Sequence, residues 1–151
     1  MPRTWSPSVT VAAIMERDGR FLMVEEEIRG RVVVNQPAGH WEPGESLLQA
    51  CVREALEETA HHFTPTALVG IYDRHEPADG KTYLRFTFCG ETGEAEAGRK
   101  LDAGILRAVW LGLEELRSLA PRHRSPVVMR CIEDYLAGRR YPLELLRHEP
   151  A

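Results

Sequence analysis

The sequence predicts one domain of mixed α/β or α+β class, arranged as a sandwich of sheet and helices. Short β-branched apolar runs precede and follow one amphipathic central segment, and more helical segments lie toward the C-terminus. A chain of 151 residues suits one domain with a sizeable core, so we expect residues 1–151 to form a single domain.

Composition is typical of a globular protein, with 43% hydrophobic and 28% charged residues. A net charge of −4 provides no basic field for nucleic acid or an anionic membrane, and we expect neither as a partner. No signal peptide or membrane-length apolar run is visible. The three widely spaced cysteines, Cys51, Cys89 and Cys131, predict buried reduced thiols. We expect a cytoplasmic monomer, with a dimer as the alternative.

Strand and turn signals fill the first third of the chain. Ser8–Ile14 is a β-branched run, and Asp18-Gly19 predicts a turn that returns Phe21–Glu25 as its hairpin partner. Arg31–Asn35 carries three valines and predicts another short strand. Two prolines and two glycines predict a loop over Gln36–Gly44.

Ser46–Thr59 is the clearest helix. At about 100° per residue, its apolar positions lie opposite an acidic patch that we expect to be exposed toward the C-terminal end. The apolar positions are Leu48, Val52, Ala55 and Leu56, and the acidic ones are Glu54, Glu57 and Glu58.

Three strands and two helices are expected after this helix. The strands are Phe63–Tyr72, Tyr83–Gly90 and Ile105–Leu111, separated by a polar turn at Asp73–Lys81 and a mobile loop at Glu91–Gly104. The helices are Leu113–Ala120 and Pro126–Ala137, the second with Ser125 as N-cap.

Glu54, Glu57 and Glu58 occupy positions i, i+3 and i+4, which share one helix face. Like charges at this spacing repel, so their presence indicates a divalent cation such as Mg²⁺ or Mn²⁺, which prefers oxygen ligands. Such a cluster alone is more often a solvated helix face. Arg53 could orient a neighbouring carboxylate, and the side-chain-free Gly39 would allow a backbone carbonyl to approach the cation.

The wider spacing is more demanding than the cluster. Six positions over twenty residues follow Gly-x5-Glu-x7-Arg-Glu-x2-Glu-Glu: Gly39, Glu45, Arg53, Glu54, Glu57 and Glu58. A metal held there neutralises phosphate charge and lowers the pKa of bound water, and one carboxylate could act as general base. The pattern therefore indicates hydrolysis at phosphorus, at a pyrophosphate linkage.

These six residues resemble the Nudix box. The resemblance implies an α/β/α sandwich with a mixed sheet and Mg²⁺-dependent hydrolysis of a nucleoside diphosphate linked to another moiety, with Mn²⁺ as possible substitute. It implies a metal site of Glu54, Glu57 and Glu58 with Gly39, and catalytic roles for Glu54, Arg53 and Glu57. The general base would be Glu54 or a carboxylate outside the box.

Flanking blocks resemble the NudJ phosphatase branch of this family: VTVAAI, NQPAGH, LRFTF, RSPVV and GRRYPLELL. That resemblance implies nucleoside tri- and diphosphates as substrates, with thiamine pyrophosphate and its hydroxymethylpyrimidine pyrophosphate precursor as further candidates. A pyrophosphatase of the ADP-ribose or dinucleotide type is the alternative, and a non-catalytic nucleotide-binding domain ranks below it.

Two departures from the family pattern leave questions open. Ala60 replaces the glycine expected at the helix end, so either alanine adopts a left-handed cap or the helix runs on. Many relatives carry an acidic residue shortly before the last strand, where this chain has Gly104, with Asp102 two residues earlier. Outside the box, His40, Tyr83 and Arg85 are candidate substrate contacts.

Overall fold

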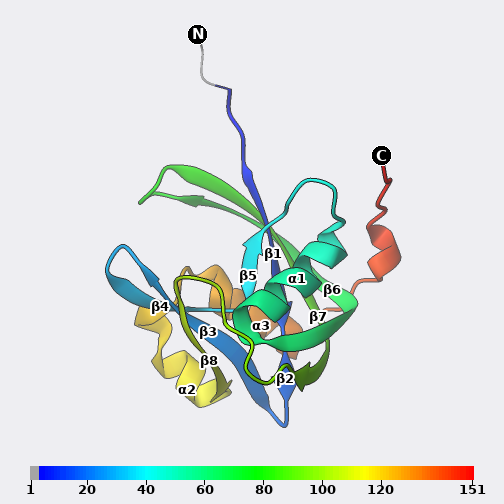
Figure 1. The fold of residues 1–151 in the computed structure, drawn as a ribbon. Helices are drawn as coiled ribbons and strands as arrows, with labels where there is room; N and C mark the ends of the chain where they lie inside the picture. The colour runs from blue at the N-terminus through cyan, green and yellow to red at the C-terminus, as the bar shows by residue number, and fades with distance from the viewer. Residues whose placement is uncertain (1–3) are drawn as a thin grey trace.

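The computed structural model describes residues 4–151, which fold into two sheets with helices on both sides (Figure 1). The first sheet has the order β5 (Ala38–His40), β1 (Ser8–Ile14), β7 (Lys81–Ala95) and β6 (His61–Glu76). β1 and β7 pair in parallel and the other neighbours are antiparallel, so the sheet is mixed.

The second sheet is built around β3 (Arg20–Ile28), which pairs with β2 (Glu16–Arg17), β4 (Arg31–Asn35) and β8 (Ile105–Gly112). Three α-helices and two short 3₁₀ helices complete the described fold. They are α1 (Leu47–Thr59), α2 (Leu113–Ser118), η1 (Ala120–Arg122), α3 (Val127–Leu136) and η2 (Leu143–Leu145).

The alternation of β1 divides the core in two. Val11 and Ala13 pack with a cluster that contains Ala50 and Ala55 of α1. Ile14 faces the other way, into a cluster with the buried side chains of α3. Because successive side chains of a strand point to opposite faces, β1 lies between α1 and α3, and the mixed α+β sandwich expected from the sequence is confirmed.

Local signals at both ends fix the extent of α1. The Ser46 hydroxyl accepts a hydrogen bond from the Gln49 N–H at 3.0 Å, and the Gln49 side chain accepts one from the Ser46 N–H at 2.8 Å. This capping box satisfies two backbone donors at the helix start. At the other end Ala60 adopts a left-handed conformation with φ 61° and ψ 12°, so the helix stops where the family pattern would place a glycine.

Several expectations about strands were wrong. The turn at Asp18-Gly19 joins β2 to β3, not β1 to β3, because β1 pairs with β5 and β7 in the other sheet. Part of the loop predicted at Gln36–Gly44 is the strand β5. β6 and β7 also run into the turn predicted at Asp73–Lys81 and the loop predicted at Glu91–Gly104, because their mutual pairing extends a long hairpin.

The predicted exposure of the acidic patch on α1 was also wrong. Glu54 and Glu58 are each only 8% exposed, and the buried face of the helix includes them together with Ala50, Cys51 and Ala55. The acidic end of α1 packs against β5, which the sequence did not reveal as a strand. At α3, Pro126 rather than Ser125 is the N-cap, although the Ser125 hydroxyl still accepts a hydrogen bond from the Val127 N–H at 3.2 Å.

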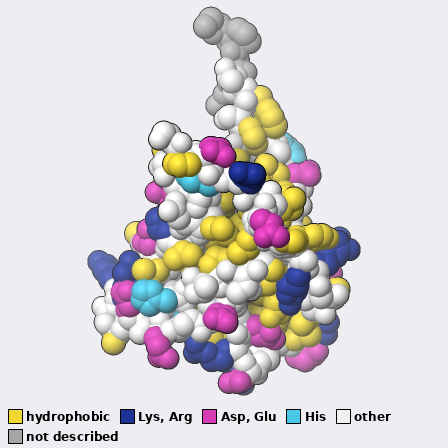
Figure 2. All heavy atoms as spheres, turned by 90° about the vertical axis from the view of Figure 1, so that its right-hand side faces the viewer, with side chains coloured by type: hydrophobic (Ala, Val, Ile, Leu, Met, Phe, Trp, Pro, Cys, Tyr) yellow, Lys and Arg dark blue, Asp and Glu magenta, His cyan; other side chains and the backbone are white. Residues whose placement is uncertain are grey.

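The three cysteines are buried free thiols, as expected. Figure 2 views the side on which the C-terminal segment lies and shows hydrophobic side chains gathered across the middle of that face, with charged side chains around them. Among residues 4–151, no helix combines the length and apolarity needed to span a bilayer. The extent of the domain over residues 1–151 and its monomeric state stay predictions.

Candidate active site

Three carboxylates converge at the C-terminal half of α1. One oxygen each from Glu54, Glu57 and Asp102 lies within 4.8 Å of the others. Asp102 reaches this position because its backbone N–H donates to the Glu57 carbonyl at 3.0 Å, which fastens the loop before β8 to the helix. Glu58 lies outside this group of three, and its carboxylate accepts a hydrogen bond from the Ala38 N–H at 2.9 Å.

Gly39 makes room for the central carboxylate. A Cβ at this position would overlap the carboxyl group of Glu54. The pairing of Val11 with Gly39 directs this face of β5 toward α1. Glycine is therefore required here by the close approach of a side chain to the backbone, not by a left-handed conformation.

Arg53 connects the loop before α1 to the carboxylates. Its guanidinium binds Glu45 in a bidentate manner, at 2.7 and 3.0 Å, and donates to the His40 carbonyl at 3.0 Å. The same group donates to Glu54 at 2.8 Å and Glu57 at 3.2 Å. Glu45 is thus tied to Arg53, which fixes the loop before the helix.

The carboxylates are held in an environment that disfavours their charge. Burial raises the pKa of Glu54 to about 7, although Arg53 acts in the opposite direction. Burial also raises the pKa of Glu58 to about 8, against the effect of the Ala38 N–H. The pKa of Glu57 is raised by burial and by the nearby Asp102. Such a cluster gains from a cation that neutralises it.

The donor set fits a hard divalent cation. It offers carboxylate oxygens from Glu54, Glu57 and Asp102, with Glu58 close by, and it contains no thiol or imidazole. The space that Gly39 leaves is filled by the Glu54 carboxylate, and Arg53 fixes the orientation of Glu54 and Glu57.

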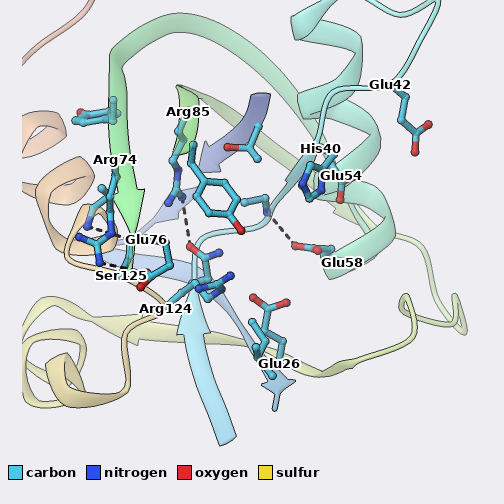
Figure 3. A pocket seen from close by; sticks show the side chains of 18 residues that line it. Glu26, His40, Glu42, Glu54, Glu58, Arg74, Glu76, Arg85, Arg124 and Ser125 are labelled. Atoms are coloured by element: carbon cyan, nitrogen blue, oxygen red, sulfur yellow. Dashed lines mark hydrogen bonds and ion pairs between the residues drawn. The ribbon is translucent and has the colours of Figure 1, made fainter. Parts of the chain in front are cut away.

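A cavity of about 440 Å³ opens beside these carboxylates and is lined by residues of both sheets, α1 and the start of α3. Figure 3 shows Glu54 and Glu58 on one side of it. Arg74 and Arg85 lie on the opposite side, and Arg124 lies between them and Glu26. The pocket therefore has an acidic end and a basic end.

The three predicted substrate residues all line this cavity. His40 lies on β5 beside the carboxylates, and Arg85 lies on β7 at the basic end. The Tyr83 hydroxyl donates to Asp79 at 2.9 Å, so its ring is anchored to the turn between β6 and β7. The structure thus brings all three to one pocket, at different distances from the carboxylates.

Sequence reasoning missed several pocket residues, among them Glu26, Arg74 and Arg124. Glu26 lies in an acidic run past the predicted end of its strand, and Arg74 lies in a segment predicted to be a turn. The alternation of β6 places Tyr72 and Arg74 on one face of the sheet. This signal can be used only if the strand is known to extend to Glu76, and the sequence did not predict that extension. Arg124 is the first residue of the RSPVV block, but that block alone does not indicate a position in a pocket.

Comparison with known proteins decides the family. The NUDIX domain family matches residues 4–131. This chain belongs to the Nudix family. It is 38% identical to the Phosphatase NudJ of Escherichia coli strain K12 over 142 residues, which cover 94% of this chain and 92% of that protein. The chain is therefore a NudJ-like hydrolase that acts on phosphoanhydride bonds, in a family that uses divalent metals and small-molecule nucleotide substrates.

Solved structures agree with this fold. A NUDIX hydrolase from Nitrosomonas europaea is 54% identical, with a TM-score of 0.94, and the match covers 95% of this chain and 98% of that one. A bifunctional NMN adenylyltransferase/ADP ribose pyrophosphatase from Francisella tularensis, complexed with AMP and Mn ion, is 18% identical. Its TM-score is 0.75, with 91% of this chain and 43% of that chain covered, and it shares the fold alone.

Proposed function

We propose that this protein is a Mg²⁺-dependent phosphohydrolase that releases phosphate from nucleoside tri- and diphosphates. Thiamine pyrophosphate and its hydroxymethylpyrimidine pyrophosphate precursor form a second group of candidate substrates. One observation carries the proposal: the oxygens of Glu54, Glu57 and Asp102 lie within 4.8 Å of one another beside a pocket with a basic far end. We also propose that it acts in the cytoplasm as a single-domain monomer.

Glu54, Glu57, Glu58 and Asp102 would hold the cation, with the backbone of Gly39 beside them. When bound, a divalent cation neutralises phosphate charge and lowers the pKa of a bound water. Mn²⁺ would serve as a substitute, since it also prefers oxygen ligands.

The chain's own groups then orient the reactants and move a proton. Arg53 holds Glu54 and Glu57 in place through hydrogen bonds to both. Glu54 is the candidate general base, because its carboxylate belongs to the cluster and also lines the pocket. Asp102 and Glu26 are the carboxylates outside the box that could serve instead.

The proposal predicts that Glu57→Gln abolishes Mg²⁺-dependent phosphate release. The amide keeps the size of the side chain but removes the charge, so we expect a fall in kcat of about 10³-fold or more. Release of inorganic phosphate is measured with nucleoside tri- and diphosphates and thiamine-type pyrophosphates, in Mg²⁺ and in Mn²⁺. Glu114→Gln is the matched control, since Glu114 is an 89% exposed helix residue paired only with Arg117.

Unchanged activity of Glu57→Gln, with Glu114→Gln behaving like the natural protein, would disprove the proposed centre. Product analysis separates the alternative of an ADP-ribose or dinucleotide pyrophosphatase. That enzyme would give two phosphomonoesters from a bridged substrate and little inorganic phosphate from a terminal pyrophosphate.

A further inference from the structure

Arg85 is a buried cation without a counter-ion. It is 8% exposed, and its guanidinium donates to the side-chain oxygens of Gln36 at 2.7 Å and Asn35 at 3.4 Å. Both acceptors are neutral amides. Among residues 4–151, no carboxylate forms an ion pair with Arg85, and its buried Nε has no hydrogen-bond partner. A buried charge with no opposite charge is costly, so a bound anion would stabilise this position.

The surroundings keep the guanidinium in the pocket. The Gln36 amide donates to the Val128 carbonyl at 2.7 Å, so its oxygen is held toward Arg85. Arg85 is also in the middle of a long strand paired on both sides. The hydrogen bonds to Gln36 and Asn35 thus hold the guanidinium at the pocket, unlike the charge of a flexible surface arginine.

The sheet register separates Arg85 from the carboxylate centre. Tyr72, Arg85, Thr10 and His40 pair in one row across β6, β7, β1 and β5, and all four line the pocket. Because neighbouring strands lie about 4.8 Å apart, the backbones of Arg85 and His40 are about 10 Å apart. His40 directly follows Gly39, which lies against Glu54, so β1 separates the strand of Arg85 from the strand that contacts the carboxylates.

Two further arginines flank Arg85. Arg74 pairs with Tyr83, which makes it a diagonal neighbour of Arg85 on the same face. Its Nη2 binds Glu76 at 3.2 Å, but its buried Nε has no partner. Arg124 lines the same end from the start of α3. This end of the pocket thus holds three guanidinium groups and one carboxylate, Glu76, and the charge of Arg85 is uncompensated, a combination that favours a bound oxyanion.

We propose that Arg85, with Arg74 and Arg124, forms an oxyanion subsite separate from the metal-bound phosphoanhydride. It would take a phosphate group, supplied either by a further phosphate of the substrate or by the inorganic phosphate that the reaction releases. The inference rests on the proposed function for the identity of the anion, and on the burial of Arg85 for the existence of the subsite.

A binding experiment without turnover tests the subsite. Inorganic phosphate is titrated into metal-free protein with chelator present, at constant ionic strength set by chloride, and Tm is followed. We expect phosphate to raise Tm in the natural protein and in Arg107→Gln, whose side chain is 61% exposed and pairs with Glu25 outside the pocket. In Arg85→Gln we expect the apparent phosphate affinity to fall about tenfold or more.

Absence of a phosphate effect in the natural protein, or an equal effect in Arg85→Gln, would overturn the inference. If Arg85→Gln does not fold, the double variant Arg74→Gln, Arg124→Gln decides in its place. A weakened phosphate effect in the double variant supports the subsite, and an unchanged one overturns it.

Steady-state kinetics with Mg²⁺ then identifies the source of the anion. If the subsite takes a phosphate of the substrate, Arg85→Gln raises KM for a nucleoside triphosphate about tenfold. If it takes the released product, KM is retained and inhibition by added phosphate weakens by a similar factor. No change in either quantity counts against the subsite. Phosphate binding through Arg85 without hydrolysis of any substrate would instead refute the proposed function and leave the anion site standing.

Discussion

At the scale of single residues, the site depends on the contacts of Arg53 and on the absence of a side chain at Gly39. Arg53 donates five hydrogen bonds, to Glu45, His40, Glu54 and Glu57. The carboxylates raise the pKa of its guanidinium further, so it keeps its charge at any ordinary pH. Gly39 leaves the space into which the Glu54 carboxylate fits. Both residues act by positioning Glu54.

We expect Gly39→Ala to reduce kcat by about 10²-fold while leaving the protein folded, because the methyl group displaces the Glu54 carboxylate by the order of an ångström. Phosphate release and Tm are measured in parallel. Gly112→Ala is the control, since a Cβ there meets only Glu115 at 3.5 Å. Near-natural kcat in Gly39→Ala would show that the close approach to Glu54 has no functional importance.

At the scale of elements, the predictable parts are those specified by local chemistry. The apolar periodicity identified α1 within one residue of its true start, which the capping box at Ser46 fixes. The box glutamates could be placed on that helix for the same reason. The strand β5, the parallel pairing of β1 with β7, and the burial of Glu54 depend on partners distant in sequence. No local pattern encodes these contacts, so the basic end of the pocket could not be assembled from sequence.

The end of α1 offers a test at this scale. Ala60 has φ 61°, a conformation that costs a non-glycine residue about 1 kcal/mol. Glycine removes that cost but gains freedom in the unfolded chain, so we expect Ala60→Gly to raise the free energy of unfolding by about 0.5 kcal/mol. The measurement is denaturant unfolding.

Ala137→Gly is the matched control, because Ala137 caps α3 with φ −72° in the right-handed region. It should lower the free energy of unfolding, since glycine relieves no strain there. If Ala60→Gly destabilises the protein as much as Ala137→Gly, the left-handed cap carries no cost.

At the scale of the whole molecule, the charged groups of the site lower the stability of the fold when no ion is bound. An acidic cluster and a basic cluster face each other across one pocket in a protein of net charge −4. The sandwich holds both, because the acidic end of α1 packs on β5 while the arginines lie on β7 and β6 of the same sheet and just before α3. Without a bound cation and anion, these groups reduce the stability of the fold.

The metal-free protein should therefore lose stability as pH rises. Glu54 and Glu58 have pKa values of about 7 and about 8 in the folded protein, above the ordinary value of 4.5. Between about pH 4.5 and 8 the folded state binds more protons than the unfolded state, so the free energy of unfolding falls with rising pH. Carboxyls whose pKa is lowered, such as Glu25 beside Arg107, change the free energy of unfolding only below this pH range.

Tm measured in chelator should fall by at least about 3 °C between about pH 5 and pH 8.5, since 1 kcal/mol shifts Tm by about 2–4 °C in a domain of this size. Glu58→Gln should show a shallower fall, and Glu114→Gln the natural one. Added Mg²⁺ should raise Tm more at the upper pH, where the carboxylates are ionised and free to bind it. A Tm that is flat or rising over this range in chelator would mean that the buried glutamates are not desolvated as the structure indicates.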